Sequence, residues 1–155
     1  MTKNKYLSLI FILIITFIAS AIGGFTTASF KEPWYSELVL PTYNPPSWVF
    51  GPVWTVLYIL MSIAIWRIWS KFFYENILKI YFIHLFFNGL WSIIFFGFHK
   101  PIIALIDLII IVGLVIYLTL QYKKFDKISF YLMIPYMLWV MYAFLLNFSI
   151  VILNN

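Results

Sequence analysis

Long apolar runs, separated by short charged clusters, form the main pattern of the chain. The stretches without a charged residue are 6–30, 38–66, 80–99, 128–155 and, apart from Asp107, 101–122. A helix needs about 20 apolar residues to cross the hydrocarbon core of a bilayer. The runs are almost continuously apolar, whereas a membrane β-strand alternates apolar and polar residues. The pattern therefore predicts five membrane-spanning helices.

We place these helices at about residues 6–27, 47–69, 78–99, 101–122 and 128–152. The predicted fold class is an all-α integral membrane protein, with a single domain over residues 1–155 that forms a bundle of five transmembrane helices. Short connections after the second, third and fourth helices make neighbouring helices run antiparallel. The first run also resembles a signal peptide, because Lys3 and Lys5 precede it, but it exceeds the about 7–15 apolar residues of such a segment.

Composition agrees with a chain that lies in lipid. Hydrophobic residues make up 65% of the 155 positions, aromatic residues 23% and charged residues 10%. A soluble domain carries about 25% charged residues, so a soluble enzyme and a nucleic-acid-binding domain are excluded. The absence of cysteine excludes a disulfide-stapled module. Because His84 and His99 are the only histidines, we expect no metal site.

The basic residues are unequally divided between the two predicted sides of the membrane. Lys31 and Lys100 lie on the side of the connection after the first helix. The opposite side carries Lys3, Lys5, Arg67, Lys71, Lys79, Lys123, Lys124 and Lys127. Cytoplasmic loops of membrane proteins are enriched in Lys and Arg. We therefore expect a cytoplasmic N-terminus and an outward-facing connection after the first helix.

The connection after the first helix, about residues 28–46, is long and rich in proline. Its prolines and large aromatic residues are Pro33, Trp34, Tyr35, Pro41, Tyr43, Pro45 and Pro46. Prolines prevent a regular helix, and large aromatic side chains need a surface on which to pack. We predict a folded lid loop over one end of the bundle. The alternative is a loop that only packs on the helix ends.

Three predicted helices carry tryptophan and polar residues on one face, because residues three or four positions apart share a face. These faces consist of Trp54, Tyr58 and Met61, of His84, Asn88, Trp91 and Phe95, and of Trp139, Ala143, Leu146 and Asn147. In the first helix, Gly23 lies on a face of small residues that leaves room. Indoles that converge inside a bundle suit a large, flat aromatic ligand, because stacking adds to the burial of apolar area.

Three polar residues inside the predicted helices need partners. The amides of Asn88 and Asn147 are costly in hydrocarbon, so they form either interhelical hydrogen bonds or contacts with a ligand. Asp107 is the single acidic residue within a predicted helix. We expect it to face the interior and to bond an indole N–H, a tyrosine hydroxyl or Lys100. The alternative for Asp107 is a role toward a ligand or a proton.

Three motifs, in order along the chain, resemble those of one membrane protein family. The first is Pro33-Trp34-Tyr35, followed by Pro41, the run from Pro45 to Thr55, and Tyr58. The second is Asn88-Gly89-Leu90-Trp91-Ser92 with Phe95-Phe96-Gly97, and the third is Pro135-Tyr136 with Trp139, Tyr142-Ala143 and Leu146-Asn147. Over its whole length the chain resembles the translocator proteins, or TspO/MBR family, also called tryptophan-rich sensory proteins or peripheral-benzodiazepine-receptor-like proteins, in their bacterial form.

This resemblance implies a five-helix bundle that often dimerises, with a ligand pocket beneath the loop after the first helix. Members bind porphyrins such as protoporphyrin IX, the isoquinoline carboxamide PK11195 and benzodiazepines. With the polar residues within the helices included, the expected ligand-binding residues are Gly23, Trp54, Tyr58, Asn88, Trp91, Asp107, Trp139, Ala143, Leu146 and Asn147. The expected lid residues are Trp34, Tyr35, Pro41, Pro45, Pro46 and Trp48.

The last predicted helix departs from the vertebrate members of this family. In those members a tyrosine and a basic residue follow the Leu-Asn pair and have been linked to cholesterol. Here Asn147 is followed by Phe148, Ser149 and Ile150. Sterol binding is therefore doubtful, and a tetrapyrrole is the better candidate.

Three functions stay open. The first is a membrane receptor or carrier for porphyrins in a bacterial cell membrane, with the bilayer and a second copy of the chain as partners and with no required cofactor. The second is light- and oxygen-dependent breakdown of a bound porphyrin, with Trp54 and Trp139 as catalytic residues. The third is a ligand-sensing scaffold that acts through a partner protein. No serine–histidine–acid set, P-loop or carboxylate pair is evident, so any chemistry depends on aromatic residues or on the bound molecule.

Overall fold

The computed structural model describes residues 4–154, which form helices and connections without a strand in that range. The long helices are α1 (Lys5–Phe30), α3 (Ser47–Phe72), α4 (Glu75–Ser92), α5 (Pro101–Phe125) and α6 (Lys127–Leu153). A π-helical turn, η1 (Ile93–Gly97), continues α4, and α2 (Trp34–Glu37) is a single turn between α1 and α3. Within the described residues, five helices are long and apolar enough to cross a membrane, as the sequence predicts.

Local chemistry explains where the helices begin. The Asn4 side chain caps α1 by accepting hydrogen bonds from the backbone N–H groups of Tyr6 and Leu7. Pro101 occupies the first turn of α5, where a missing N–H costs nothing. The predicted lid loop differs in two respects: α1 continues to Phe30, so residues 28–30 are helical, and residues 34–37 form a helical turn. Proline at a helix start is tolerated, which is why one turn of helix, α2, forms directly after Pro33.

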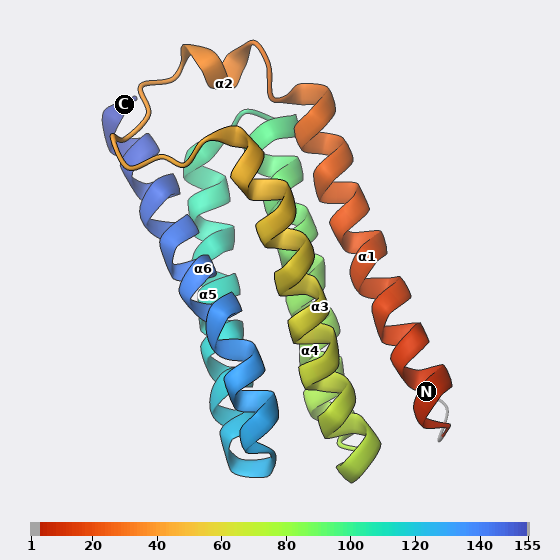
Figure 1. The fold of residues 1–155 in the computed structure, drawn as a ribbon. Coiled ribbons are helices and arrows are strands. Elements are labelled where there is room, and N and C mark those ends of the chain that lie inside the picture. The colour runs from red at the N-terminus through yellow and green to blue at the C-terminus, as the bar shows by residue number, and fades with distance from the viewer. Residues whose placement is uncertain (1–3, 155) are drawn as a thin grey trace.

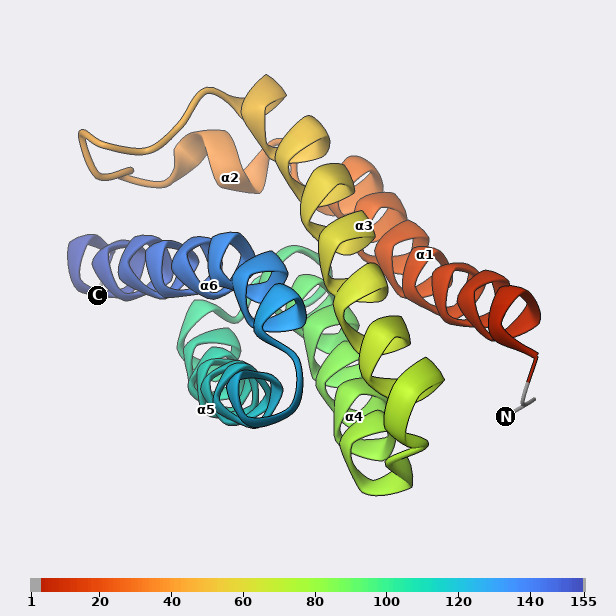
Figure 2. The ribbon, with the colours of Figure 1, turned by 60° about the horizontal axis from the view of Figure 1, so that its bottom comes forward.

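The five long helices form a closed ring in the order α1, α3, α6, α5, α4, in which each helix packs on both of its neighbours. Figure 2 shows α3 and α4 between α1 on one side and α5 and α6 on the other. The lid loop leaves the end of α1, crosses that end of the bundle toward the C-terminus of α6, and returns to the start of α3 (Figure 1). The lid therefore covers one end of the ring.

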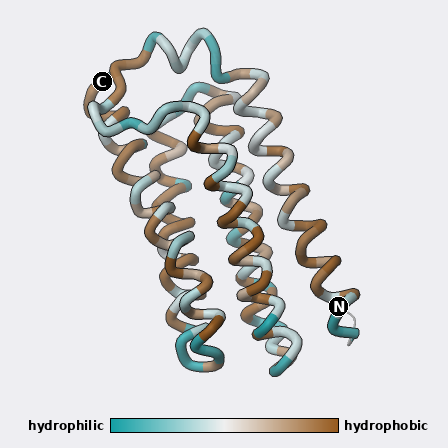
Figure 3. The backbone as a smooth tube through the Cα atoms, in the orientation of Figure 1, coloured by the Kyte–Doolittle hydropathy of each residue, from teal (hydrophilic) through white to brown (hydrophobic). Residues whose placement is uncertain are grey.

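The outer surface of the ring is apolar along its length. Large hydrophobic side chains such as Ile14, Ile59, Phe86, Ile106 and Leu138, one from each long helix, are exposed. Figure 3 shows hydrophobic colouring along the helices and hydrophilic colouring at their ends. An apolar surface of this extent fits lipid and would be costly in water.

The bundle is tightly packed in the half that lies away from the lid. Met61, Ile65, Tyr81, Leu118 and Met133 have no exposed surface there and belong to one continuous core. A smaller cluster, which contains Tyr35 and Phe95, lies beneath the lid loop. Both halves of the bundle therefore contain buried apolar contacts, and the larger cluster lies away from the lid.

Candidate ligand-binding site

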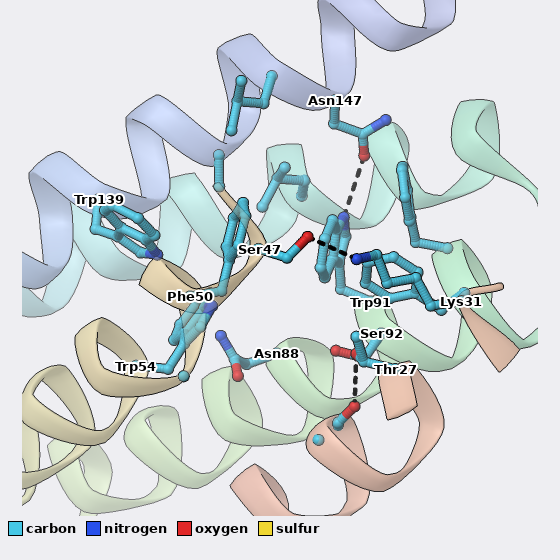
Figure 4. A pocket seen from close by; sticks show the side chains of 18 of the residues that line it. Thr27, Lys31, Ser47, Phe50, Trp54, Asn88, Trp91, Ser92, Trp139 and Asn147 are labelled. Atoms are coloured by element: carbon cyan, nitrogen blue, oxygen red, sulfur yellow. Dashed lines mark hydrogen bonds between the residues drawn. The ribbon is translucent and has the colours of Figure 1, made fainter. Parts of the chain in front are cut away.

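A cavity of about 490 Å³ lies between the helices in the lid half of the bundle. All five long helices, η1 and the lid loop contribute to its wall, and Figure 4 shows the side chains around it. The expected ligand residues that line the cavity are Gly23, Trp54, Tyr58, Asn88, Trp91, Trp139, Ala143, Leu146 and Asn147. Successive members on each helix are at most four positions apart, so each helix presents one face to the cavity.

One wall of the cavity is a cluster of aromatic rings from α3 and α6. Trp54 stacks on Tyr58 with a centroid distance of 5.3 Å, and its ring stands perpendicular to that of Trp139 at 6.4 Å. Phe50 and Tyr136 meet these two indoles edge-on, at 6.0 Å from Trp139 and 6.2 Å from Trp54, respectively. Edge and stacked pairs of this kind stabilise one another by about 0.5–1.5 kcal/mol each. The wall is therefore rigid and apolar.

A second aromatic group lies under the lid loop. Trp91 stacks on Phe95 with a centroid distance of 5.1 Å and an interplanar angle of 20°. Tyr35 of α2 packs on Phe95 and Phe96, and Trp34 meets Phe95 edge-on at 5.4 Å. Since Tyr35, Trp91, Phe95 and Phe96 also line the cavity, the lid loop forms part of its roof.

The Asn88 side chain joins three helices at the cavity wall. The Tyr58 hydroxyl of α3 donates a hydrogen bond to Asn88 Oδ1, and Asn88 Nδ2 donates to the Tyr136 hydroxyl of α6 at 3.0 Å. The Tyr136 hydroxyl also bonds His84 Nε2 at 2.6 Å. Of the two roles expected for Asn88, interhelical hydrogen bonding and ligand contact, the structure shows the first. The same contacts hold the ring of Tyr58 against Trp54.

Asn147 performs a similar function nearer the lid. Its Oδ1 accepts a hydrogen bond of 3.1 Å from Trp91 Nε1, and its Nδ2 donates one of 3.0 Å to the carbonyl oxygen of Pro101. One amide of α6 thus connects α4 with the first turn of α5. The Trp91 ring is held in place on the cavity wall by this bond.

The lid loop is attached to α6 by hydrogen bonds between residues far apart in sequence. The backbone N–H of Val39 donates to Asn154 Oδ1 at 2.9 Å, and Asn154 Nδ2 donates to the Val39 carbonyl at 3.0 Å. The Tyr142 hydroxyl donates to the Tyr43 carbonyl at 2.6 Å. Within the loop, the Tyr35 hydroxyl donates to Asn44 Oδ1, and burial raises the pKa of Tyr35. The lid is therefore a folded structure with defined contacts.

The remaining predicted residues lie outside the cavity wall. Asp107 is buried, but α5 lines the cavity with Leu108 and Ile111 instead, and Asp107 Oδ2 has no hydrogen-bond partner among residues 4–154. The expected hydrogen bond from an indole N–H, a tyrosine hydroxyl or Lys100 is therefore not found at Asp107 Oδ2. Trp34 stacks on His99 at 4.5 Å, and Trp48 is 76% exposed at the start of α3. The prolines of the lid loop shape it without lining the cavity.

Several lining residues were not singled out from the sequence. The mouth of the cavity contains Lys31, Glu32, Asn44 and Ser47, where Lys31 Nζ donates a hydrogen bond of 2.8 Å to Ser47 Oγ. A hydrogen bond with Ser36, and the charge of Lys31, hold the pKa of Glu32 below its usual range. The positive-inside count uses Lys31 only as an orientation signal. The position of Lys31 within the predicted lid loop is the signal that could have identified it as a residue of the cavity mouth.

Five lipid-facing helices around an indole-lined cavity, closed by a folded loop, define a multi-pass membrane protein with an internal small-molecule cavity. The chain belongs to the TspO/MBR family, whose model matches residues 11–153. It is an integral membrane protein, as the five apolar helices indicate. The resemblance seen in the tryptophan and proline motifs is thereby confirmed.

Named relatives come from distant organisms. A tryptophan-rich protein TspO of Archaeoglobus fulgidus is 37% identical over 134 residues, which are 85% of this chain and 87% of the relative. A tryptophan-rich sensory protein of Cereibacter sphaeroides is 35% identical over 145 residues, 92% of this chain and 91% of the relative. The translocator protein of Homo sapiens is 30% identical over 142 residues, 86% and 84% of the two chains.

Proposed function

We propose that the protein is a membrane receptor or carrier that binds porphyrins of the protoporphyrin IX class in the cavity beneath the lid loop. Isoquinoline carboxamides and benzodiazepines, which are also aromatic and largely apolar, are further ligands of the same site. The observation that carries the proposal is the wall formed by Trp54, Tyr58 and Trp139 on a cavity of about 490 Å³. Small-molecule sites commonly have volumes of about 300–1,000 Å³ and mostly apolar walls.

Two further features support binding of a flat aromatic molecule. The Trp139 ring lines the cavity and is held by edge-on contacts with Phe50 and Trp54, so this part of the wall is apolar and fixed in place. The asparagines on the wall are already engaged with other helices, so the walls are held in place before a ligand enters. A preformed site loses less entropy on binding.

The proposal is tested by filling the cavity. Ala143 lines it, so Ala143→Phe should occupy part of the space and weaken protoporphyrin IX binding at least about tenfold. Binding is measured on purified protein from the absorption of the porphyrin. Leu145→Phe, at a half-exposed position of the same helix, is the matched control and should bind normally. Equal affinity of the Ala143→Phe protein and the control would place any porphyrin site elsewhere.

A second candidate function, breakdown of the bound porphyrin, is favoured by the position of two indoles on one wall. In light, an excited porphyrin can pass an electron to dioxygen, which gives superoxide and a porphyrin cation radical. Trp54 and Trp139 would lie against the ring, where an indole can reduce that radical or react with the activated oxygen. The porphyrin supplies the photochemistry, and the protein positions it.

Illumination of the complex separates breakdown from binding alone. Trp54→Phe and Trp139→Phe proteins should still hold porphyrin, more weakly, but should no longer form the product absorption band seen with the unchanged protein. Trp66→Phe, whose indole lies at the other end of α3 and donates to the Lys5 carbonyl, is the control. Bleaching at the rate of free porphyrin in every variant would exclude an enzymatic role.

A further inference from the structure

The charge on the cavity wall is confined to its mouth. Of the described residues that line the cavity, Lys31 and Glu32 carry charge, and both belong to the segment between α1 and α2. Trp54 and Trp139 form the wall away from them, and Figure 4 shows Lys31 and Trp139 on opposite sides of the space. The cavity is therefore polar at one edge and apolar at the other.

The Lys31 side chain is held at this edge by three contacts. Its Nζ donates a hydrogen bond of 2.8 Å to Ser47 Oγ at the start of α3, and it lies 4.9 Å from the centroid of the Tyr35 ring. Glu32 Oε1 is 3.5 Å from the same Nζ. The Lys31 side chain is 20% exposed, and its ammonium group is directed toward Ser47 at the mouth of the cavity.

Glu32 only partly neutralises Lys31. The Glu32 side chain is 56% exposed, and a solvated ion pair with a separation of 3.5 Å is weak. An ammonium group has three N–H donors, of which Ser47 takes one. A ligand carboxylate that enters the mouth can therefore replace Glu32 as the anionic partner of Lys31, while Glu32 turns outward.

We propose that Lys31, together with Ser47, binds a carboxylate of the ligand, and that the site selects flat aromatic acids whose charged group lies at one edge of the ring system. The inference rests on the proposed function of the cavity and adds the group that orients the ligand. The aromatic part lies against the wall that contains Trp54 and Trp139, and the acid group lies under the lid loop. The single ammonium group of Lys31 has the Glu32 carboxylate beside it, which would repel a doubly charged phosphate. The site therefore suits a carboxylate, which carries one negative charge, better than a phosphate dianion.

The strength of the contact follows from its surroundings. A hydrogen bond between an ammonium and a carboxylate is about twice as strong as one between neutral groups. Tyr35, which is buried, covers this position from the lid side. We expect removal of the Lys31 charge to weaken binding of an acid about tenfold or more.

The test compares protoporphyrin IX with its dimethyl ester, which has the same ring system and no carboxylate. Lys31→Met should weaken binding of the acid about tenfold and leave binding of the ester unchanged. Lys31→Arg should retain the preference for the acid, and Glu32→Gln should increase it. Lys100→Met, at an exposed lysine on the same end of the bundle that does not line the cavity, is the matched control. The two porphyrins partition differently into detergent. This difference is the same for every variant, so it cancels when the ratio of acid affinity to ester affinity is compared between variants.

A second probe pair, 1-pyrenebutyric acid and its methyl ester, separates this inference from porphyrin binding itself. Failure of the unchanged protein to bind either porphyrin contradicts the proposed function, and the pyrene pair then still tests Lys31. The same acid-to-ester ratio in the Lys31→Met and unchanged proteins overturns the inference, as does an equal loss of acid and ester. Failure of both acids to bind the unchanged protein overturns it as well.

Discussion

At the scale of single residues, the two buried asparagines show how the bundle satisfies polar groups in an apolar interior. Asn88 and Asn147 each use the oxygen and the nitrogen of the amide for bonds to other helices. Both residues line the cavity, yet neither amide depends on a ligand for a partner. Their main contribution is therefore to hold Tyr58 and Trp91 in fixed positions on the wall.

Replacement of Asn147 should reveal a structural role. Asn147→Leu leaves the Trp91 indole N–H without its acceptor and should cost about 1–2 kcal/mol of stability. For a chain of this size, that corresponds to a fall in Tm of about 2–8 °C in detergent. Phe148→Leu, at an exposed neighbouring position, is the control and should leave Tm nearly unchanged. An unchanged Tm combined with lost porphyrin affinity would instead identify Asn147 as a direct ligand contact.

At the scale of elements, the connection between α5 and α6 is the point where three helices are fastened together away from the lid. Asp126 accepts hydrogen bonds from Arg67 Nε at 2.8 Å and from Lys71 Nζ at 2.6 Å, both from α3. It also caps α6 through the backbone N–H and hydroxyl of Ser129. The Arg67 guanidinium, with Lys71 and Ser129, holds the pKa of Asp126 well below its usual range.

The lowered pKa predicts how stability depends on pH. The unfolded chain takes up a proton at Asp126 near its ordinary pKa of 3.8, before the folded protein does. The contribution of the Asp126 charge to the free energy of unfolding is thus complete at pH values above 3.8, and it is lost as the pH falls below that value. Asp126→Asn should cost about 1–2 kcal/mol at neutral pH, and its difference from the unchanged protein should shrink between pH 5 and pH 2. The measurement is denaturation in detergent as a function of pH.

The control for this experiment is Glu75→Gln, because Glu75 is exposed and lies 4.0 Å from Lys79 in a solvated pair. Its stability should follow the pH dependence of the unchanged protein. A difference between the Asp126→Asn and unchanged proteins that stays constant from pH 7 to pH 2 would mean that Asp126 acts by its shape rather than its charge.

The helices could be predicted from the sequence because a membrane imposes a length on each apolar run. The faces that line the cavity also followed from helical spacing, since Trp54 and Tyr58, or Trp139 and Ala143, are one turn apart. Asp107 is buried, as expected, but its absence from the cavity wall could not be predicted, because the exact rotation of a helix that is apolar on all sides depends on its packing. Nor could the pairing of Val39 with Asn154, which are 115 residues apart, because local patterns contain no information on distant contacts.

At the scale of the whole molecule, the two ends of the ring have different chemistry. The lid end carries the cavity mouth with Lys31, and the opposite end carries the basic residues of the other connections, apart from Lys3, which lies outside the described residues. A ligand that enters beneath the lid must therefore come from the lid side of the membrane or from the adjoining lipid. The orientation of the chain decides which compartment the cavity serves.

The positive-inside distribution predicts that the lid loop faces outward, and the chain is well suited to a direct test because it contains no cysteine. Thr42→Cys places a thiol in the lid loop, and Asn76→Cys places one in the first turn of α4; both positions are exposed and neither change alters charge. In intact bacterial cells, a membrane-impermeant maleimide should label Thr42→Cys protein at once. It should label Asn76→Cys protein only after the membrane is permeabilised, and the cysteine-free chain should show no labelling. The reverse pattern would place the lid in the cytoplasm, and the cavity would then receive its ligands from inside the cell.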